Sequence, residues 1–188
     1  MRPLPEERHP PIPLARDLAV VTIPDGKVDK LPAGTIVQVT QTLGTSYTVK
    51  TDRGAKYRIA GEDGDAVGMP RLSATRIEPA GESQKDLEAA ARKALGRVFD
   101  PEIPVDIVNL GLVHELKLER KEDGWHATVR MGLTSPGCGM GDVLVRDVEQ
   151  ALRSIPGVAF VDAKVVLFPV WNPHTMMSEA AKLKLGLL

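Results

Sequence analysis

The strongest constraint on the fold is a run of strict alternation in the second half of the chain. Trp125, Ala127, Val129, Met131 and Leu133 alternate with polar residues. Successive side chains of a strand point to opposite faces, so this run predicts a strand with one apolar face. Such a face must be buried against another layer, and helices packed on a small sheet would bury it.

Helical periodicity on either side of this strand supplies the expected layer. Ser83 and Asp86 form a capping-box-like start, after which apolar residues recur at helical spacing up to Val98. A second helix opens in 137–141 and stops at Pro156-Gly157. The expected strands lie at 116–119, 125–133 and 161–167, and a short helix at 178–185 ends the chain. This order predicts an α+β domain over residues 83–188, with helices on a small mixed sheet.

The first part of the chain has a different pattern. Residues 14–79 contain short β-branched and apolar runs separated by turn signals, which predict a small all-β, barrel-like domain of four or five strands. The acidic run 62–65 lacks the ligand spacing of a calcium loop and predicts a solvated turn. Residues 78–81 are interpreted as a linker, and residues 1–13, with five prolines, as an extended tail.

Composition excludes several classes of function. The chain has 188 residues, a net charge of −1 and 4% aromatic residues, which does not favour a nucleic-acid or anionic-membrane reader. No apolar run reaches membrane-spanning length and no secretory leader is evident, so a cytoplasmic location is expected. The single cysteine excludes an internal disulfide and fits a reducing compartment.

The loop after the alternating strand is the best candidate for chemistry. Residues 133–142 contain three glycines and the only cysteine, Cys138, between a strand and a helix. Amide groups at a helix start favour a negative group, and cysteines at such positions have lowered pKa values. The residue types leave a nucleophile, a redox sensor and a metal ligand open, and a free cysteine is also often only a small buried apolar residue.

A second loop carries carboxylates. Asp100, Glu102 and Asp106 alternate with the stiffening prolines Pro101 and Pro104. Beside a thiolate, carboxylates could complete a metal shell or raise the thiol pKa by repulsion, but solvation of the loop with Asp100 as a turn or cap residue is the favoured explanation. The histidines have no ligand spacing, and neither a phosphate-binding loop nor a nucleophile elbow is present in the sequence.

These segments together resemble a known family. The runs RVFDPEIPVDIVNLGLVHEL, MGLTSPGC, SIPGV and WNPHTMMSEAAKLKLGLL are similar to the SufT branch of the small iron–sulfur assembly domain, which also occurs in PaaD-like proteins. The resemblance covers about residues 83–188, and the first part of the chain resembles the extra β-rich domain of SufT proteins.

The resemblance implies an accessory role in the assembly or transfer of iron–sulfur clusters. It places Asp100 and Glu102 in a D-P-E motif and Thr134 and Cys138 in a T-x-x-x-C motif, and it implies that the two loops meet at one end of the sheet. Thr134 would hydrogen-bond Asp100 or orient the loop. Trp171 is interpreted either as core packing or as a partner-docking anchor.

The resemblance also implies a cargo and partners. A transient Fe–S cluster or iron would be held through Cys138, with Asp100, Glu102 and Thr134 around it. One thiolate is too few for a cluster, so a homodimer or exogenous thiols would complete the ligands. The expected partners are other iron–sulfur assembly proteins and apo-client proteins. The alternatives are a thiol-dependent enzyme or redox protein that uses Cys138 as nucleophile, and a PaaD-like maturation partner of one oxygenase.

Overall fold

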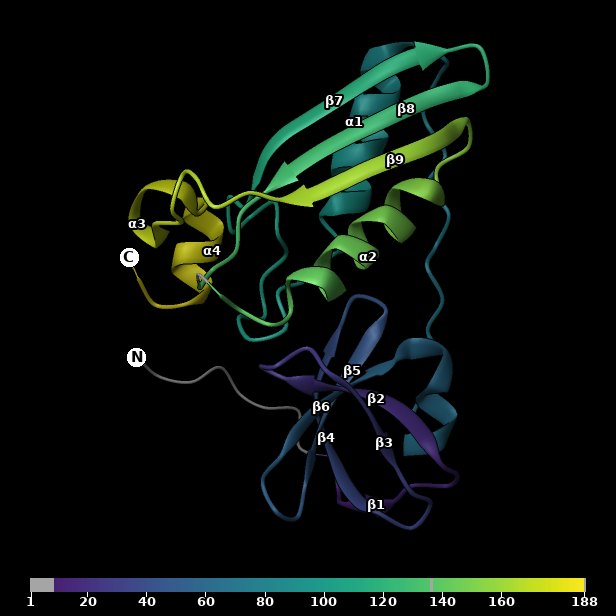
Figure 1. Cartoon of the computed structure of the whole chain (residues 1–188), viewed down its shortest axis with the longest axis vertical. Coiled ribbons are helices and arrows are strands. Elements are labelled where there is room, and N and C mark those ends of the chain that lie inside the picture. The colour runs from purple at the N-terminus through teal and green to yellow at the C-terminus, as the bar shows by residue number, and fades with distance from the viewer. Residues whose placement is uncertain (1–8, 136, 188) are drawn as a thin grey trace. The chain divides into compact units, whose positions relative to one another are not determined.

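The computed structural model describes residues 9–135 and 137–187, which divide into two compact units (Figure 1). The N-terminal unit comprises the chain up to Ser73 together with 101–104, and the C-terminal unit comprises 74–100 and the chain from Val105 onward. None of the helices in the described ranges combines the length and the apolar character needed to cross a bilayer.

The N-terminal unit is an antiparallel six-stranded sheet. Its strand order is β1-β4-β5-β6-β2-β3, so β1 and β3 are edges that do not pair with each other. The sheet is therefore open, and the expected barrel closure is not found, because the two edge strands are too short to complete a ring. The strands are β1 Ile12–Pro13, β2 Leu18–Ile23, β3 Val28–Leu31, β4 Ile36–Leu43, β5 Ser46–Thr51 and β6 Lys56–Ala60.

The proline-rich segment at 1–13 ends in a strand of the sheet. Residues 1–8 of the expected tail lie outside the described residues. Ile12 and Pro13, at the other end, are paired with Val37 and Ile36 of β4. The end of this segment is thus part of the sheet, in the edge position that a proline tolerates.

The acidic run of this unit forms a 3-10 helix, η1 (Gly61–Val67), in place of the expected solvated turn. Asp63 forms a 2.6 Å ion pair with Arg16, and Asp65 pairs with Arg16 at 3.4 Å and with Arg71 at 3.2 Å. Two of the three carboxylates of the run, those of Asp63 and Asp65, are therefore paired with arginines.

The C-terminal unit is a three-stranded mixed sheet with two helices. β8 pairs antiparallel with β7 and parallel with β9, and α1 and α2 both lie on one face of the sheet (Figure 1). This mixed sheet with packed helices agrees with the sequence prediction. The elements are α1 Gln84–Leu95, β7 Val113–Lys121, β8 Gly124–Met131, α2 Gly141–Arg153, β9 Val158–Val165, α3 Pro173–Met176 and α4 Glu179–Lys184.

The predicted apolar stripes form the core between these layers. The Ser83 side chain accepts the amide hydrogen bond of Asp86 at 3.1 Å, as the capping pattern predicts. The alternating residues of β8 from Ala127 to Met131 are buried, whereas Trp125 is half-buried. The buried helix residues are Leu87, Ala90, Ala91, Ala94 and Leu95 of α1 and Val143, Leu144, Val148 and Leu152 of α2, followed by Ile155.

The third strand is shorter than its alternation suggests. β9 ends at Val165, and Leu167, expected on the buried face, is 71% exposed. β8 ends at Met131, so the chain beyond Val166 has no strand beside it that could continue the ladder. The alternation in 161–167 therefore overestimates the strand by two residues.

A half-buried histidine is expected to make the stability of this unit depend on pH. His114 is the extra residue at a bulge in β7, and within the described chain its buried Nε2 has no hydrogen-bond partner. Burial lowers the pKa of His114 below its usual 6.5, because a charged ring loses its hydration there. The unfolded chain thus takes up a proton near pH 6.5, whereas the folded chain takes it up only at lower pH.

We expect the free energy of unfolding of the C-terminal unit to fall as pH drops below about 6.5. Urea denaturation at pH 7.5 and 5.5, followed by tryptophan fluorescence, measures this change. The variant His114→Gln removes the titration and should show a smaller pH dependence. An equal pH dependence in the two proteins would assign the effect to other groups.

Candidate functional site

The glycine-rich loop connects β8 to α2 and contains Cys138. The amide of Cys138 donates to the carbonyl of Ser135 at 3.2 Å, and the amide of Gly141 donates to the carbonyl of Cys138 at 3.3 Å. Met140 is the N-cap of α2 and is 2% exposed, so it anchors the far end of the loop in the core. Cys138 is half-buried and makes no disulfide. It precedes the first helical residue by three positions, and so lies outside the first turn of α2. Pro136 lies outside the described residues.

Asp100 and Thr134 are brought together from the two loops. The Thr134 hydroxyl donates a hydrogen bond of 3.1 Å to a carboxylate oxygen of Asp100, which is only 4% exposed. The amide of Asp100 donates to the carbonyl of Val105 at 3.1 Å, which closes the proline-containing loop. Of the two roles expected for the Thr134 hydroxyl, the hydrogen bond to Asp100 is present, and it joins the carboxylate loop to the start of the cysteine loop.

The Thr134 hydroxyl is expected to stabilise the fold as well as the site. Thr134→Val keeps the shape but removes the donor to a buried carboxylate, and should lower the free energy of unfolding by about 1–3 kcal/mol. Thr134→Ser retains the hydroxyl and should lose much less. Chemical denaturation followed by tryptophan fluorescence compares the two variants. A loss in Thr134→Ser as large as in Thr134→Val would show that the methyl group, not the hydrogen bond, matters.

Glu102, unlike Asp100, is not buried. Its side chain is exposed, and it belongs to the segment 101–104 that groups with the N-terminal unit. Within the described ranges, no group of three or more histidine, cysteine, aspartate or glutamate side chains is arranged to hold a metal ion. The residues that the C-terminal unit itself brings to this region are thus Asp100, Thr134 and the Cys138 loop.

Asp106, the third carboxylate, has a structural role that its spacing did not reveal. It accepts hydrogen bonds from the amides of Val108 and Asn109 at 3.1 and 2.9 Å, and from the Asn109 side chain at 2.8 Å. Asn109 in turn accepts a 2.7 Å bond from the Ser178 hydroxyl. This chain of contacts fastens the C-terminal segment to the loop, which explains Asp106 without a ligand.

Trp171 also fastens the C-terminal segment to the loop that follows Asp106. Its indole N–H donates to the carbonyl of Leu110 at 2.7 Å, and the side chain is half-buried. Of the two interpretations of this residue, the structure supports packing within the unit. An Asx-type turn at Asp106 is recognisable from sequence, but the bonds from Trp171 to Leu110 and from Ser178 to Asn109, which join residues 61 and 69 positions apart, are not.

Comparison with known proteins adds the family context. The model of the "Iron-sulfur cluster assembly protein" family matches residues 88–165, which include Asp100, Thr134 and Cys138. An "Fe-S protein maturation auxiliary factor" of Porphyromonas gingivalis is 41% identical over 96 residues, 51% of this chain and 88% of the relative. The "Fe-S protein maturation auxiliary factor SufT" of Staphylococcus aureus is 42% identical over 89 residues, 47% of this chain and 97% of the relative.

A more distant match concerns a larger protein. An "Iron-sulfur cluster carrier protein" of Deinococcus radiodurans is 38% identical over 69 residues, 37% of this chain but only 19% of that protein. The auxiliary factors, in contrast, are matched over almost their full length. On this evidence the chain belongs to the iron–sulfur cluster assembly protein family, in its SufT-type branch.

Proposed function

We propose that this chain is a non-enzymatic auxiliary factor in the assembly of iron–sulfur clusters or their transfer to client proteins, and that it acts through Cys138. The observation that carries the proposal is the 41–42% identity to maturation auxiliary factors over 88–97% of their length. Their names describe auxiliary factors rather than enzymes, which supports the non-enzymatic role.

The geometry of the cysteine loop supports contact with a cargo. The loop is held at one end by the Thr134–Asp100 hydrogen bond and at the other by buried Met140, whereas Gly137 and Gly139 on either side of Cys138 are exposed. A half-buried thiol between two glycines allows a partner's backbone to approach closely. The loop is therefore suited to contact a group presented by another protein.

The number of ligands that the chain supplies decides whether it can store an iron–sulfur cluster or only transfer one. An iron–sulfur cluster usually has four protein ligands, and this chain has one cysteine. The cargo, a cluster or iron, would take its other ligands from an assembly protein, a client or a second copy of the chain. Such shared ligation is weak and exchangeable, which suits transfer better than storage.

We assign the two predicted domains different tasks within this function. Residues 83–188 would contact the cargo, and the β-rich domain at 14–79 would dock partner proteins. The assignment of 14–79 is motivated by its small β architecture and by the lack of a catalytic cluster in its sequence. A chain beginning near Gly81 should then fail to restore function in cells, and full restoration by it would refute the docking role.

The proposal is tested by metal analysis of the full chain. Iron and acid-labile sulfide per chain are measured after anaerobic reconstitution of wild type, Cys138→Ser and the control Ser135→Ala, which alters an exposed residue of the same loop. Wild type and the control should bind both elements, and Cys138→Ser neither. Equal binding by all three proteins, or binding by none, contradicts a cargo contact through Cys138.

A second measurement concerns the role in cells. Deletion of the gene should lower the activity of cluster-dependent enzymes under iron limitation while their polypeptide levels stay near normal. The Ser135→Ala chain should restore activity and the Cys138→Ser chain should not. Unchanged enzyme activity in the deletion strain would contradict the maturation role itself.

A further inference from the structure

Two lysines lie directly opposite each other at one end of the N-terminal sheet. Lys50 of β5 and Lys56 of β6 are partners in the antiparallel ladder, and both residues are exposed. Side chains at such positions are about 5 Å apart at Cβ, so like charges there repel each other and lower the stability of the sheet. Neither lysine forms an ion pair within residues 9–135 and 137–187. The fold itself therefore leaves this repulsion uncompensated.

The surroundings of the two lysines are also basic. Elsewhere in this unit, Arg16, Lys30 and Arg71 are paired with aspartates. The stretches 23–28 and 50–58, which adjoin through the ladder between β2 and β6, contain five basic residues and two aspartates. This end of the sheet is thus a basic face with a positive local potential. Its basic residues are Lys27, Lys50, Arg53, Lys56 and Arg58, and its aspartates are Asp25 and Asp52.

The two lysines belong to a row that crosses four strands. Gln38 of β4 is the partner of Lys50, and Ile23 of β2 is the partner of Lys56. Directly opposed residues of an antiparallel ladder share one face of the sheet, so the four side chains form a single row. Adjacent strands are about 4.8 Å apart, so the row spans about 14 Å, the length of about four residues of extended chain.

Apolar side chains border the row. Val28 of β3 is 73% exposed and lies on the same face as Arg58, because both residues are partners of Val21. Beside Lys50, a hollow of about 280 Å³ is lined in part by Ile36, whose side chain is exposed. Positive charges between exposed apolar side chains are complementary to a polypeptide segment that carries both acidic and apolar residues.

The basic face lacks the aromatic side chains that nucleic-acid binding would use. Tyr47 and Tyr57 are the aromatic residues of 9–73, and both belong to the core: Tyr47 is 1% exposed, and Tyr57 packs against the core cluster. Proteins that bind single-stranded nucleic acid usually stack its bases on aromatic rings. The charge and the side chains of this face therefore favour an acidic polypeptide as the partner.

We propose that the basic face, centred on Lys50 and Lys56, is a docking site for an acidic segment of a partner protein. Carboxylates of the segment pair with the two lysines and relieve their repulsion, and an apolar side chain beside them enters the hollow next to Ile36. The identification of this partner as an iron–sulfur assembly protein or a client rests on the proposed function, in which the β-rich domain docks partner proteins; the charge complementarity of the basic face does not.

The probe for the test is a fluorescein-labelled peptide of about eight residues in which glutamate and leucine alternate. Its binding to the full chain is followed by fluorescence anisotropy at about 25 mM salt, where charges are weakly screened. Saturable binding is expected for wild type, and Lys50→Gln/Lys56→Gln should weaken it about fivefold or more, because two ion pairs are lost. Both changed residues are exposed, and an unchanged circular dichroism spectrum verifies that the variant is folded.

Matched controls separate a local site from an effect of net charge. Lys85→Gln/Lys93→Gln removes the same charge from exposed positions of α1, and this variant should bind the peptide as wild type does. A peptide with glutamines in place of the glutamates should bind weakly. Absence of saturable binding, or an equal loss in the α1 variant, overturns the proposal. Tighter binding of an oligothymidylate of equal charge would make a nucleic acid the partner, and would overturn an acidic segment.

The outcome also separates this proposal from the proposed function. Cys138→Ser should bind the peptide as wild type does, so a failed iron and sulfide test with intact peptide binding refutes only the cargo contact. Loss of peptide binding in wild type, with iron and sulfide bound as expected, refutes only the docking role of the basic face.

Discussion

Gly111→Ala is expected to lower the free energy of unfolding of the C-terminal unit by about 3–5 kcal/mol. Gly111 has a φ of +72°, a conformation that residues with a side chain rarely adopt. A Cβ atom at this position would lie 2.0 Å from the carbonyl oxygen and 2.7 Å from the carbonyl carbon of Met176. Backbone atoms cannot move aside as a flexible side chain can, so the C-terminal segment would have to shift.

The measurement uses the distribution of aromatic residues. Both tryptophans, Trp125 and Trp171, belong to the C-terminal unit, so tryptophan fluorescence follows the unfolding of this unit alone. Gly186→Ala is the matched control, because Gly186 has a φ of +69° but a Cβ atom there would meet nothing within 4 Å. The control should lose only about 1–2 kcal/mol, the cost of the left-handed conformation. Equal losses in the two variants would refute the close contact with Met176.

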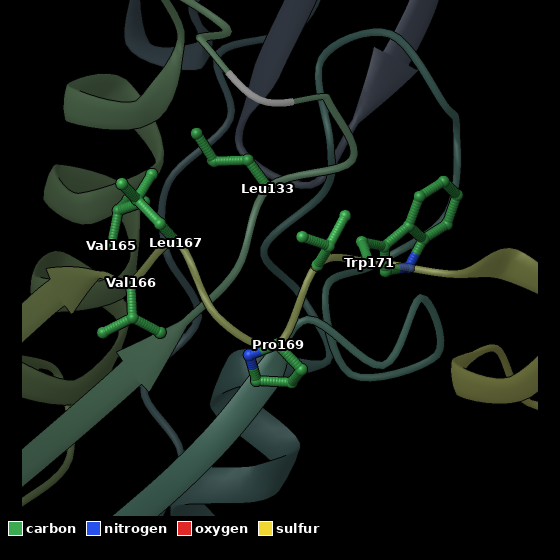
Figure 2. A pocket seen from close by; sticks show the side chains of 7 residues that line it. Leu133, Val165, Val166, Leu167, Pro169 and Trp171 are labelled. Atoms are coloured by element: carbon green, nitrogen blue, oxygen red, sulfur yellow. The ribbon is translucent and has the colours of Figure 1, made fainter.

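The effect of Gly111→Ala bears on the site through the C-terminal segment. Met176 lies in α3, between Trp171, which donates to Leu110, and Ser178, which donates to Asn109. These contacts fasten the segment to the loop that contains Gly111. A chain released there would also lose the position of Trp171 beside Leu133, the residue at the start of the cysteine loop (Figure 2).

The elements of the C-terminal unit were predictable where one face is buried along the whole element. In α2 the apolar residues at helical spacing, and in β8 the alternating apolar residues, are the residues that are buried. Alternation failed at Leu167, because apolar residues on an exposed surface produce the same pattern as residues of a buried strand. In the N-terminal unit, the edge strands β1 and β3 have few buried residues and therefore almost no periodic signal.

The candidate site was predictable only in part. Cys138 stands out as the single cysteine in a glycine-rich loop, whereas the pairing of Asp100 with Thr134 came from the family resemblance. The sequence does not distinguish a loop carboxylate that ligates a metal from one that only accepts hydrogen bonds within the fold. Asp106 illustrates this, since its role depends on the fold of Asn109 and on Ser178, far along the chain.

The glycine of the acidic run in the N-terminal unit, Gly64, is required by close packing. A Cβ atom on Gly64 would lie 2.1 Å from the carbonyl oxygen of Pro70 and 2.9 Å from the ring of Tyr47. Tyr47 is 1% exposed, and its hydroxyl donates to that same carbonyl at 2.7 Å. The amide of Met69 donates to the carbonyl of Gly64 at 2.9 Å, which holds η1 against the segment that follows it.

Gly64→Ala is therefore expected to lower the free energy of unfolding of the N-terminal unit by about 2–4 kcal/mol, because it forces Pro70 away from the tyrosine hydroxyl. Amide hydrogen exchange followed by mass spectrometry should show faster exchange in β4, β5 and β6. The control is Gly54→Ala in the turn between β5 and β6, where a Cβ meets no atom within 4 Å and only the φ of +86° is unfavourable. If Gly54→Ala accelerated exchange as much as Gly64→Ala, the backbone conformation rather than the contact with Pro70 would explain the glycine. A larger effect of Gly64→Ala would show that the glycine is needed for the packing of η1 against Pro70. The aspartates on either side of it are paired with Arg16 and Arg71.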